Sequence, residues 1–279
     1  MLTKSELVGR ALGLGELAAV SRDLTYELCA YGPRDTPAMW KTVFDWIARM
    51  EWADRYLGGP PLVDTNIEYY VDNYLYFHGY LPASILVMAH IDTVPGTVGA
   101  EDNASGVVGL MHFMTRYIRD RMEGKEVPGI DFLFTTREES PYFGTERMGS
   151  FKFFQEHPPE SYGLIVNLDC IGFSGKGPAP NGYALVSNQH FWEDYKSTAK
   201  VILSQGLTLF GVHSEDNLLT LSDTRWAYDR TLTMHVHDSS VYGENFFHFP
   251  EDTPDKLDYI KMTRLVETTY NSIRKAYYE

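Results

Sequence analysis

Between Ser84 and His90 every side chain is apolar. A short strand that is apolar on both faces is typical of a parallel sheet covered by helices on either side. Two more short segments, 130–136 and 162–171, have strand character, and segments with helical periodicity separate them. This alternation predicts an α/β protein, a three-layer α/β/α sandwich with a mostly parallel, mixed central sheet.

Helical periodicity and chain-breaking residues predict the other elements. Asp35 or Thr36 can cap a helix that has Pro37 in its first turn and runs to residue 48. We expect further helices within 1–30 and at 104–121, 144–157, 191–205 and 255–278, and further strands at 65–78, 183–187 and 231–237. No repeat or long linker divides the chain, so we expect a single domain of residues 1–279.

The chain carries a formal net charge of −14, from 38 acidic and 24 basic residues. This balance argues against nucleic acid as a partner, because phosphate binding needs a basic face. An acidic cleft would instead attract a cationic group such as a peptide α-ammonium, although acidity also serves solubility alone. Acidic residues interrupt the amino terminus, and no apolar run reaches about 18 residues. We therefore expect a soluble, cytoplasmic protein with no membrane contact.

Polar residues gather where predicted strands end. His90 ends the first apolar run, Glu138 and Glu139 follow segment 130–136, and Asp169 lies near the end of the next strand. Open α/β sheets form their ligand crevices at the carboxyl ends of strands. A buried strand gains nothing from a Glu-Glu end unless the charge is compensated, so these four residues are candidates for a functional site.

Asp92, Asp102 and His248 extend this set. His90 and Asp92 project to the same side of an extended chain, so the carboxylate can fix the imidazole, although a structural pair has the same pattern. Asp102 opens a turn into a helix, where a carboxylate is ordinarily a cap. Two imidazoles and three carboxylates nevertheless form the ligand set of two divalent ions that share one carboxylate, and those five residues are His90, Asp102, Glu139, Asp169 and His248.

Two other histidines, His235 and His237, lie two apart on a predicted strand and share one face. They form a possible metal pair, but lining of a substrate pocket or a structural role is favoured, and the sequence leaves the choice open. The remaining histidines have no chemically supportive neighbours.

Five motifs in this order resemble the two-zinc aminopeptidase family, metallopeptidase family 28, which also contains the glutaminyl cyclases. The resemblance extends from residues 31–37 to 248–258. The motifs are AHID (89–92), EDNASG (101–106), REES (137–140), NLDC (167–170) and FHFPEDT (247–253). The resemblance implies a zinc-dependent exopeptidase-like fold and two zinc ions per chain.

The resemblance also implies a division of roles. His90 and Asp169 would hold one metal, and Glu139 and His248 the other, with Asp102 bridging the two. Glu138 would be the general base, Asp92 would orient His90, and the peptide bond after Asp102 would be cis. No cofactor besides zinc is expected.

The sequence departs from the family at Asp223-Thr224, where relatives often have Asp-His, and at Phe249, where Thr is usual. The short stretch between residues 88 and 99 leaves no room for an inserted lid. Trp226, Tyr228 and Tyr242 are candidates for a substrate-pocket wall.

An aminopeptidase that acts on a peptide or aminoacyl substrate is the favoured function. A glutaminyl cyclase shares the motifs and is the main alternative. A zinc carboxypeptidase or deacylase has a similar first motif but usually carries a separate domain. A non-catalytic binding module should have lost ligands, and none of the five is missing. The sequence does not predict the oligomeric state.

Overall fold

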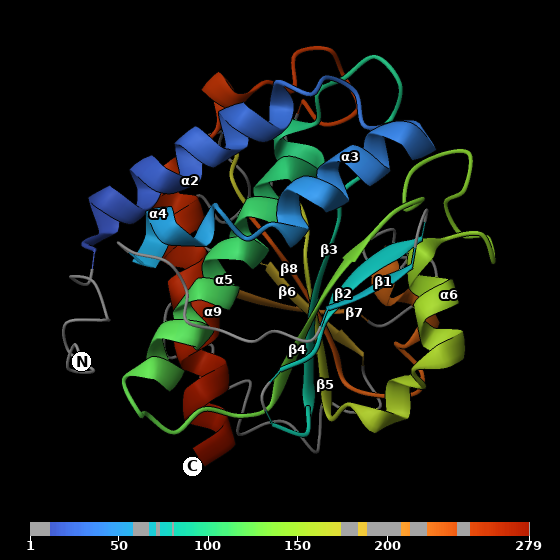
Figure 1. Cartoon of the computed structure of the whole chain (residues 1–279). Coiled ribbons are helices and arrows are strands. Elements are labelled where there is room, and N and C mark those ends of the chain that lie inside the picture. The colour runs from blue at the N-terminus through green and yellow to red at the C-terminus, as the bar shows by residue number, and fades with distance from the viewer. Residues whose placement is uncertain are drawn as a thin grey trace.

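A mixed eight-stranded sheet forms the centre of the protein (Figure 1). The computed structural model describes residues 12–57, 67–70, 73–79, 81–173, 184–188, 208–212, 222–238 and 246–278. The strand order is β1-β2-β4-β3-β5-β8-β6-β7. The strands are β1 (Ile67–Tyr70), β2 (Tyr74–Phe77), β3 (Ile85–His90), β4 (Ile130–Thr135), β5 (Leu164–Leu168), β6 (Ala184–Asn188), β7 (Thr208–Val212) and β8 (Thr233–His237).

The middle of the sheet, β4-β3-β5-β8, is parallel throughout. The β1-β2 hairpin adds antiparallel strands at one edge, and β6 pairs antiparallel with β8 at the other. The predicted mostly parallel, mixed sheet is therefore confirmed. Adjacent parallel strands have their carboxyl ends on the same side of the sheet, so the residues that follow β4, β3 and β5 are brought together there.

Strand β3 is apolar on both faces because each face meets a separate hydrophobic core. Ile85, Val87 and Ala89 belong to the larger core, whereas Leu86 and Met88 belong to the smaller one. All five side chains are almost completely buried. At about 25 cal/mol per Å² of buried apolar surface, the two cores supply the main driving force for folding.

Helices cover both faces and give the predicted three layers. Residues of α2, α3, α4, α5 and α9 belong to the larger core, and α6 lies on the opposite side of the sheet (Figure 1). The helices are α2 (Leu14–Cys29), α3 (Pro37–Ala48), α4 (Ala53–Leu57), α5 (Gly106–Met122), α6 (Gly149–Glu156) and α9 (Tyr259–Tyr278). Short helical turns are η1 (Ala100–Ser105), η2 (Pro159–Ser161), η4 (Asp223–Trp226) and η6 (Pro254–Lys256). None of the helices within the described ranges is long and apolar enough to cross a membrane.

Most predicted elements are confirmed, with shifts at their ends. Thr36 caps α3 by accepting from the amide of Met39, with Pro37 in the first turn, as the sequence indicates. The expected helix 144–157 begins only at Gly149 because a series of turns precedes it. Strand β7 and the short helix α4 were not predicted. The expected helix 191–205 lies outside the described residues.

Candidate metal centre

The carboxyl ends of three neighbouring strands supply four of the candidate residues. His90 is the last residue of β3, and Asp169 directly follows β5. Glu138 and Glu139 lie in the turn that follows β4. Because β4, β3 and β5 are adjacent and parallel, these side chains share one edge of the sheet, and all four are buried.

Asp102 lies in η1, between β3 and α5, and its backbone is not helical. The Asp102–Asn103 peptide bond is cis, as predicted. The Asn103 side chain donates to the carbonyl of Leu168 at 2.9 Å and accepts from the amide of Gly106 at 3.0 Å. A Cβ at position 106 would collide with the Asn103 side chain and the Leu168 carbonyl, so only glycine fits. The turn therefore fixes Asp102 beside the end of β5.

Backbone conformations rare for side-chain-bearing residues occur at the same edge. Arg137, Cys170 and His248 have φ values of 60°, 53° and 68°. Residues with a Cβ seldom adopt positive φ, and such conformations persist where the surrounding structure enforces them. Arg137 immediately precedes Glu138, and Cys170 immediately follows Asp169. The backbone is thus bent at the points that aim the candidate side chains.

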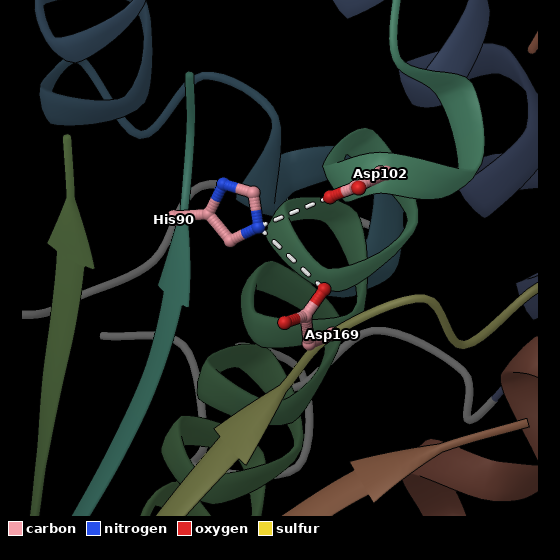
Figure 2. Close-up of side chains that lie close together, drawn as sticks. All are labelled: His90, Asp102 and Asp169. Carbon is pink, nitrogen blue, oxygen red and sulfur yellow. Dashed lines mark ion pairs between the residues drawn. The ribbon is translucent and has the colours of Figure 1, made fainter. Parts of the chain in front are cut away.

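Two triads of one histidine and two carboxylates share Asp102. The Nε2 atom of His90 lies 3.2 Å from Oδ1 of Asp102 and 3.5 Å from Oδ1 of Asp169 (Figure 2). The Nε2 atom of His248 lies 3.1 Å from Oδ2 of Asp102 and 3.1 Å from Oε2 of Glu139. The two oxygens of Asp102 therefore face different histidines, which is the arrangement expected of a carboxylate that bridges two ions.

The residues present fit divalent metal ions. Nε2 of His90 forms no hydrogen bond of acceptable geometry with the carboxylates beside it, and the buried Oε1 of Glu139 has no hydrogen-bond partner among the described residues. Unpaired buried polar atoms are costly, and a metal ion would satisfy them. Nitrogen and carboxylate oxygen donors in this combination suit zinc. In each triad the potential ligand atoms lie within 4.8 Å of one another.

The crowded charges shift the protonation of these groups. Burial lowers the pKa of His90, but nearby carboxylates, above all Glu138, raise it well above its usual value. Burial raises the pKa of Glu138 well above its usual range, and Glu139 and Asp169 add to this shift. Burial and Asp102 together raise the pKa of Glu139 to about 7. Bound cations would instead lower the pKa values of these carboxyl groups, because they favour the ionised form.

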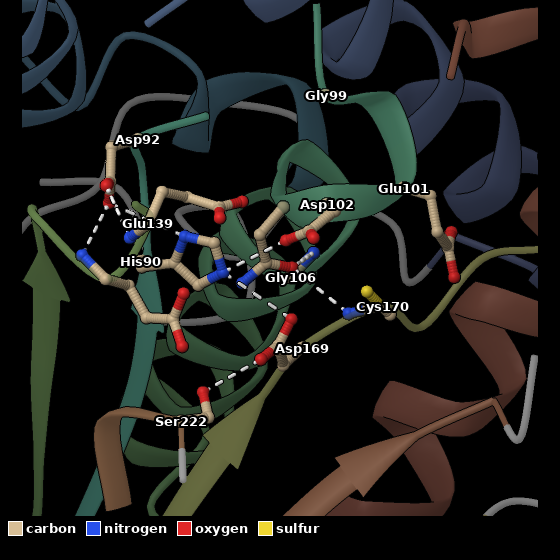
Figure 3. A network of polar contacts seen from close by, with 12 residues as sticks. His90, Asp92, Gly99, Glu101, Asp102, Gly106, Glu139, Asp169, Cys170 and Ser222 are labelled. Atoms are coloured by element: carbon tan, nitrogen blue, oxygen red, sulfur yellow. Dashed lines mark hydrogen bonds and ion pairs between the residues drawn. The ribbon is translucent and has the colours of Figure 1, made fainter. Parts of the chain in front are cut away.

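Asp92 connects the ends of β3 and β4. Its carboxylate accepts hydrogen bonds from the amides of Glu138 at 3.2 Å and Glu139 at 3.0 Å (Figure 3). Its Oδ1 atom also lies 3.5 Å from Nδ1 of His90. The orienting role of Asp92 toward His90 stays a prediction, and the bonds to the Glu-Glu turn were not predicted. One carboxylate therefore holds the two glutamates by hydrogen bonds and lies beside the histidine.

The family model described as Peptidase family M28 matches residues 78–273, which is most of the chain. The chain belongs to peptidase family M28. Among curated relatives, Escherichia coli YfbL, an uncharacterized protein, is 26% identical over 216 residues, which cover 66% of this chain and 64% of YfbL. A vacuolar membrane protease of Candida albicans is 30% identical over 53% of this chain and 17% of its own length. The chain thus spans less than two thirds of these relatives.

Solved structures of M28-type proteins share the fold. The Legionella pneumophila LapA aminopeptidase matches with a TM-score of 0.67 and 18% identity, over 95% of this chain and 75% of LapA. A Bacteroides thetaiotaomicron glutaminyl cyclase matches with a TM-score of 0.64 and 15% identity, over 96% of this chain and 99% of the cyclase. A Zn-dependent exopeptidase from Parabacteroides distasonis matches with a TM-score of 0.63 and 17% identity, over 92% of this chain and 97% of the exopeptidase.

Further residues of this M28 member support the site and were not assigned roles from the sequence. Ser222 donates to Oδ2 of Asp169 at 2.9 Å and accepts from the side chain of Asn167 at 3.0 Å. Asp252 accepts hydrogen bonds from the amides of Glu101 at 2.7 Å and Asp102 at 3.2 Å. Asp252 belongs to the motif at 247–253 and Ser222 directly precedes Asp223-Thr224, but their contacts depend on how distant loops meet.

Asp223 is a buried carboxylate near the same edge. The Thr135 hydroxyl donates to it at 2.6 Å. Burial is the main reason that its pKa rises to about 6, while His90 acts in the opposite direction. It adds another negative charge beside Glu138.

His235 and His237 are both buried in β8. Nε2 of His235 lies 3.7 Å from Oδ2 of Asp169. In the part of the chain that the structure describes, neither histidine belongs to a metal-type cluster. Trp226, suggested as a pocket wall, packs its ring on Phe151 of α6 at 4.8 Å between centroids. Tyr242 lies outside the described residues.

Proposed function

We propose that this M28 member is a metal-dependent hydrolase, and specifically an aminopeptidase that removes amino-terminal residues from peptides with the aid of two zinc ions. The observation that carries the proposal is the pair of triads that share Asp102, with Glu138 beside them. The Zn-dependent exopeptidase among the structural neighbours supports the choice of metal.

Five residues would hold the ions. His90 and Asp169 would bind one, Glu139 and His248 the other, and Asp102 would bridge them. Paired zinc ions, when bound, polarise a carbonyl oxygen and lower the pKa of water. Asp92 holds the turn that carries Glu139, and Ser222 holds Asp169. These hydrogen bonds fix the ligands in place, which metal affinity requires.

Glu138 serves as the general base. Its carboxylate lies near His90 and Glu139, within the same group of potential ligand atoms, and only 7% of the residue is exposed. Burial raises its pKa, and a base works best when its pKa approaches the working pH. Glu138 accepts a proton from the attacking water and then donates that proton to the departing amine.

The site opens on the side of His248. Its side chain is 45% exposed, whereas the other four proposed ligands are buried. Phe249, the next residue, is 57% exposed. We infer that substrate enters from this side and that its α-ammonium group is attracted by the surrounding carboxylates. The exposed ring of Phe249 would favour an apolar amino-terminal side chain.

A glutaminyl cyclase is the second candidate. The match to the Bacteroides enzyme covers 99% of that chain, whereas the match to LapA covers 75%. The two functions make different products from one substrate, a peptide with an amino-terminal glutamine. A cyclase joins the α-amine to the side-chain carbonyl and releases ammonia without cutting a peptide bond, while an aminopeptidase releases free glutamine.

A panel of zinc-loaded assays tests the proposal. Aminoacyl p-nitroanilides, the same compounds acetylated at the amino group, and a glutaminyl peptide serve as substrates. We expect hydrolysis of the free-amine compounds and no reaction of the acetylated ones. Ammonia release from the glutaminyl peptide without cleavage would contradict the aminopeptidase and support the cyclase. Faster hydrolysis of the acetylated compounds would contradict the amino-terminal preference.

A further inference from the structure

Arg34 is a completely buried cation that lies outside the two triads. It follows α2 and precedes α3, and its exposed fraction is 0%. Its guanidinium donates to three backbone carbonyls, those of Ile91 through Nε at 2.6 Å, Val98 through Nη1 at 2.6 Å and Gly99 through Nη2 at 3.0 Å. All three carbonyls belong to one segment, residues 91–99.

That segment joins two of the proposed metal ligands. It begins directly after His90 and leads into η1, which carries Asp102. Gly99, at the end of the segment (Figure 3), has a φ of 54°, and a Cβ there would collide with the Asp102 carbonyl and crowd the Arg34 guanidinium. Arg34 therefore holds both ends of the connection between the two ligands.

The backbone of Arg34 binds the same segment. Its amide donates to the Thr93 hydroxyl at 2.9 Å, and its carbonyl accepts from the Thr93 amide at 3.3 Å. The indole of Trp40 donates to the same carbonyl at 2.7 Å. These bonds hold the backbone of Arg34 in place. They thereby fix the position from which its side chain reaches residues 91–99.

A buried guanidinium needs compensation, because burial of an unpaired charge is costly. Burial lowers the pKa of Arg34, while Cys29, Asp252 and Asp92 favour its charged form. Its hydrogen bonds go to backbone carbonyls, which a planar fork of five donors can serve together and a lysine ammonium cannot. The residue is therefore suited to fixing backbone geometry.

We propose that Arg34 is a positioning residue that sets the relative placement of His90 and Asp102, and through them the geometry of the metal site. The inference rests on the proposed function, because it assumes that these two residues bind metal. Residues that orient metal ligands typically change metal affinity by about 10- to 100-fold when they are replaced. We expect a loss of that size when the guanidinium fork is removed.

Arg34→Lys and Arg34→Met test the proposal, with Arg119→Met as the matched control. Arg119 is also buried, at 6% exposure, and its guanidinium donates to the backbone carbonyl of Tyr56, on α4. Zinc affinity is measured by competition with a chromogenic chelator, and the visible spectrum of the cobalt(II)-substituted protein reports ligand geometry. Circular dichroism confirms folding, and Arg34→Lys decides the question if Arg34→Met does not fold.

We expect both Arg34 variants to bind zinc about 10- to 100-fold more weakly and to give an altered cobalt spectrum. The Arg119 variant should lose stability but keep the affinity and spectrum of the unsubstituted protein. Unchanged affinity and spectrum in Arg34→Lys would overturn the proposal, as would an equal change in Arg119→Met. Failure of the unsubstituted protein to bind metal would overturn the proposed function itself, so the two failures are distinguishable.

Discussion

Replacement of Glu138 by glutamine separates a general base from its metal-binding neighbour. The glutamine keeps the size of the side chain and the backbone amide that donates to Asp92 at 3.2 Å. It removes a carboxylate whose pKa burial raises well above the usual range. The fold should therefore remain intact, and stability should be unchanged or slightly higher because one like charge leaves a buried cluster.

The catalytic loss should be large. General acid–base catalysis typically contributes 10²- to 10⁴-fold, so kcat should fall by about that factor, equivalent to about 3–5 kcal/mol. KM and zinc content should stay close to those of the unsubstituted enzyme, because Glu138 is not among the five proposed ligands. Steady-state kinetics with an aminoacyl p-nitroanilide and metal analysis of the same sample provide the test.

Glu139→Gln is the matched control, since the two glutamates are adjacent in one turn. Glu139 lies 3.1 Å from His248 and belongs to the second triad. Its replacement should reduce zinc content as well as activity. Retention of full activity by Glu138→Gln, or the same loss of zinc in both variants, would refute the assignment of the two roles.

Three further predictions concern the turn at Asp102, the proposed ions and the ion pairs between α5 and α9. Gly106→Ala should cost about 2 kcal/mol or more of unfolding free energy in urea, because the new methyl group would collide with Asn103 and a backbone carbonyl of β5. A chelator should lower Tm by about 5–10 °C if the ions stabilise the fold by about 2–3 kcal/mol; an unchanged Tm would contradict this. Burial raises the pKa of Glu267, but His112 and Arg116 outweigh it and hold the pKa below the usual 4.5. A lowered carboxyl pKa stabilises the fold above pH 4.5, and this contribution is lost as the pH falls through the folded pKa. Glu267→Gln should therefore cost about 1–2 kcal/mol of unfolding free energy at pH 7 and progressively less as the pH falls below 4.5. A difference that does not shrink in acid would argue against the pairing.

Much of the candidate site could be predicted from sequence because it depends on local rules. His90, Glu138 and Asp169 follow strands of recognisable apolar character, and parallel neighbouring strands bring their ends together without further information. The order of the five motifs then supplied Asp102 and His248 by resemblance. The structure places all five candidate ligands in one group, although metal binding by them stays a prediction.

The supporting contacts could not be predicted in the same way. Asp252 bonds to amides about 150 residues earlier in the chain, and Arg34 bonds to carbonyls about 60 residues later. No periodicity or spacing encodes such pairings, since they depend on the path of irregular loops. The late start of α6 has a similar cause, because turns after the Glu-Glu segment occupy residues with adequate helical character.

Anomalous diffraction at the zinc absorption edge, from crystals of zinc-loaded protein, tests the central claim most directly. The account predicts two peaks, one between His90 and Asp169 and one between Glu139 and His248, with an oxygen of Asp102 directed at each. A single peak at either position would contradict the two-ion site. Peaks only at His235 and His237 would contradict the assignment of the ligands altogether.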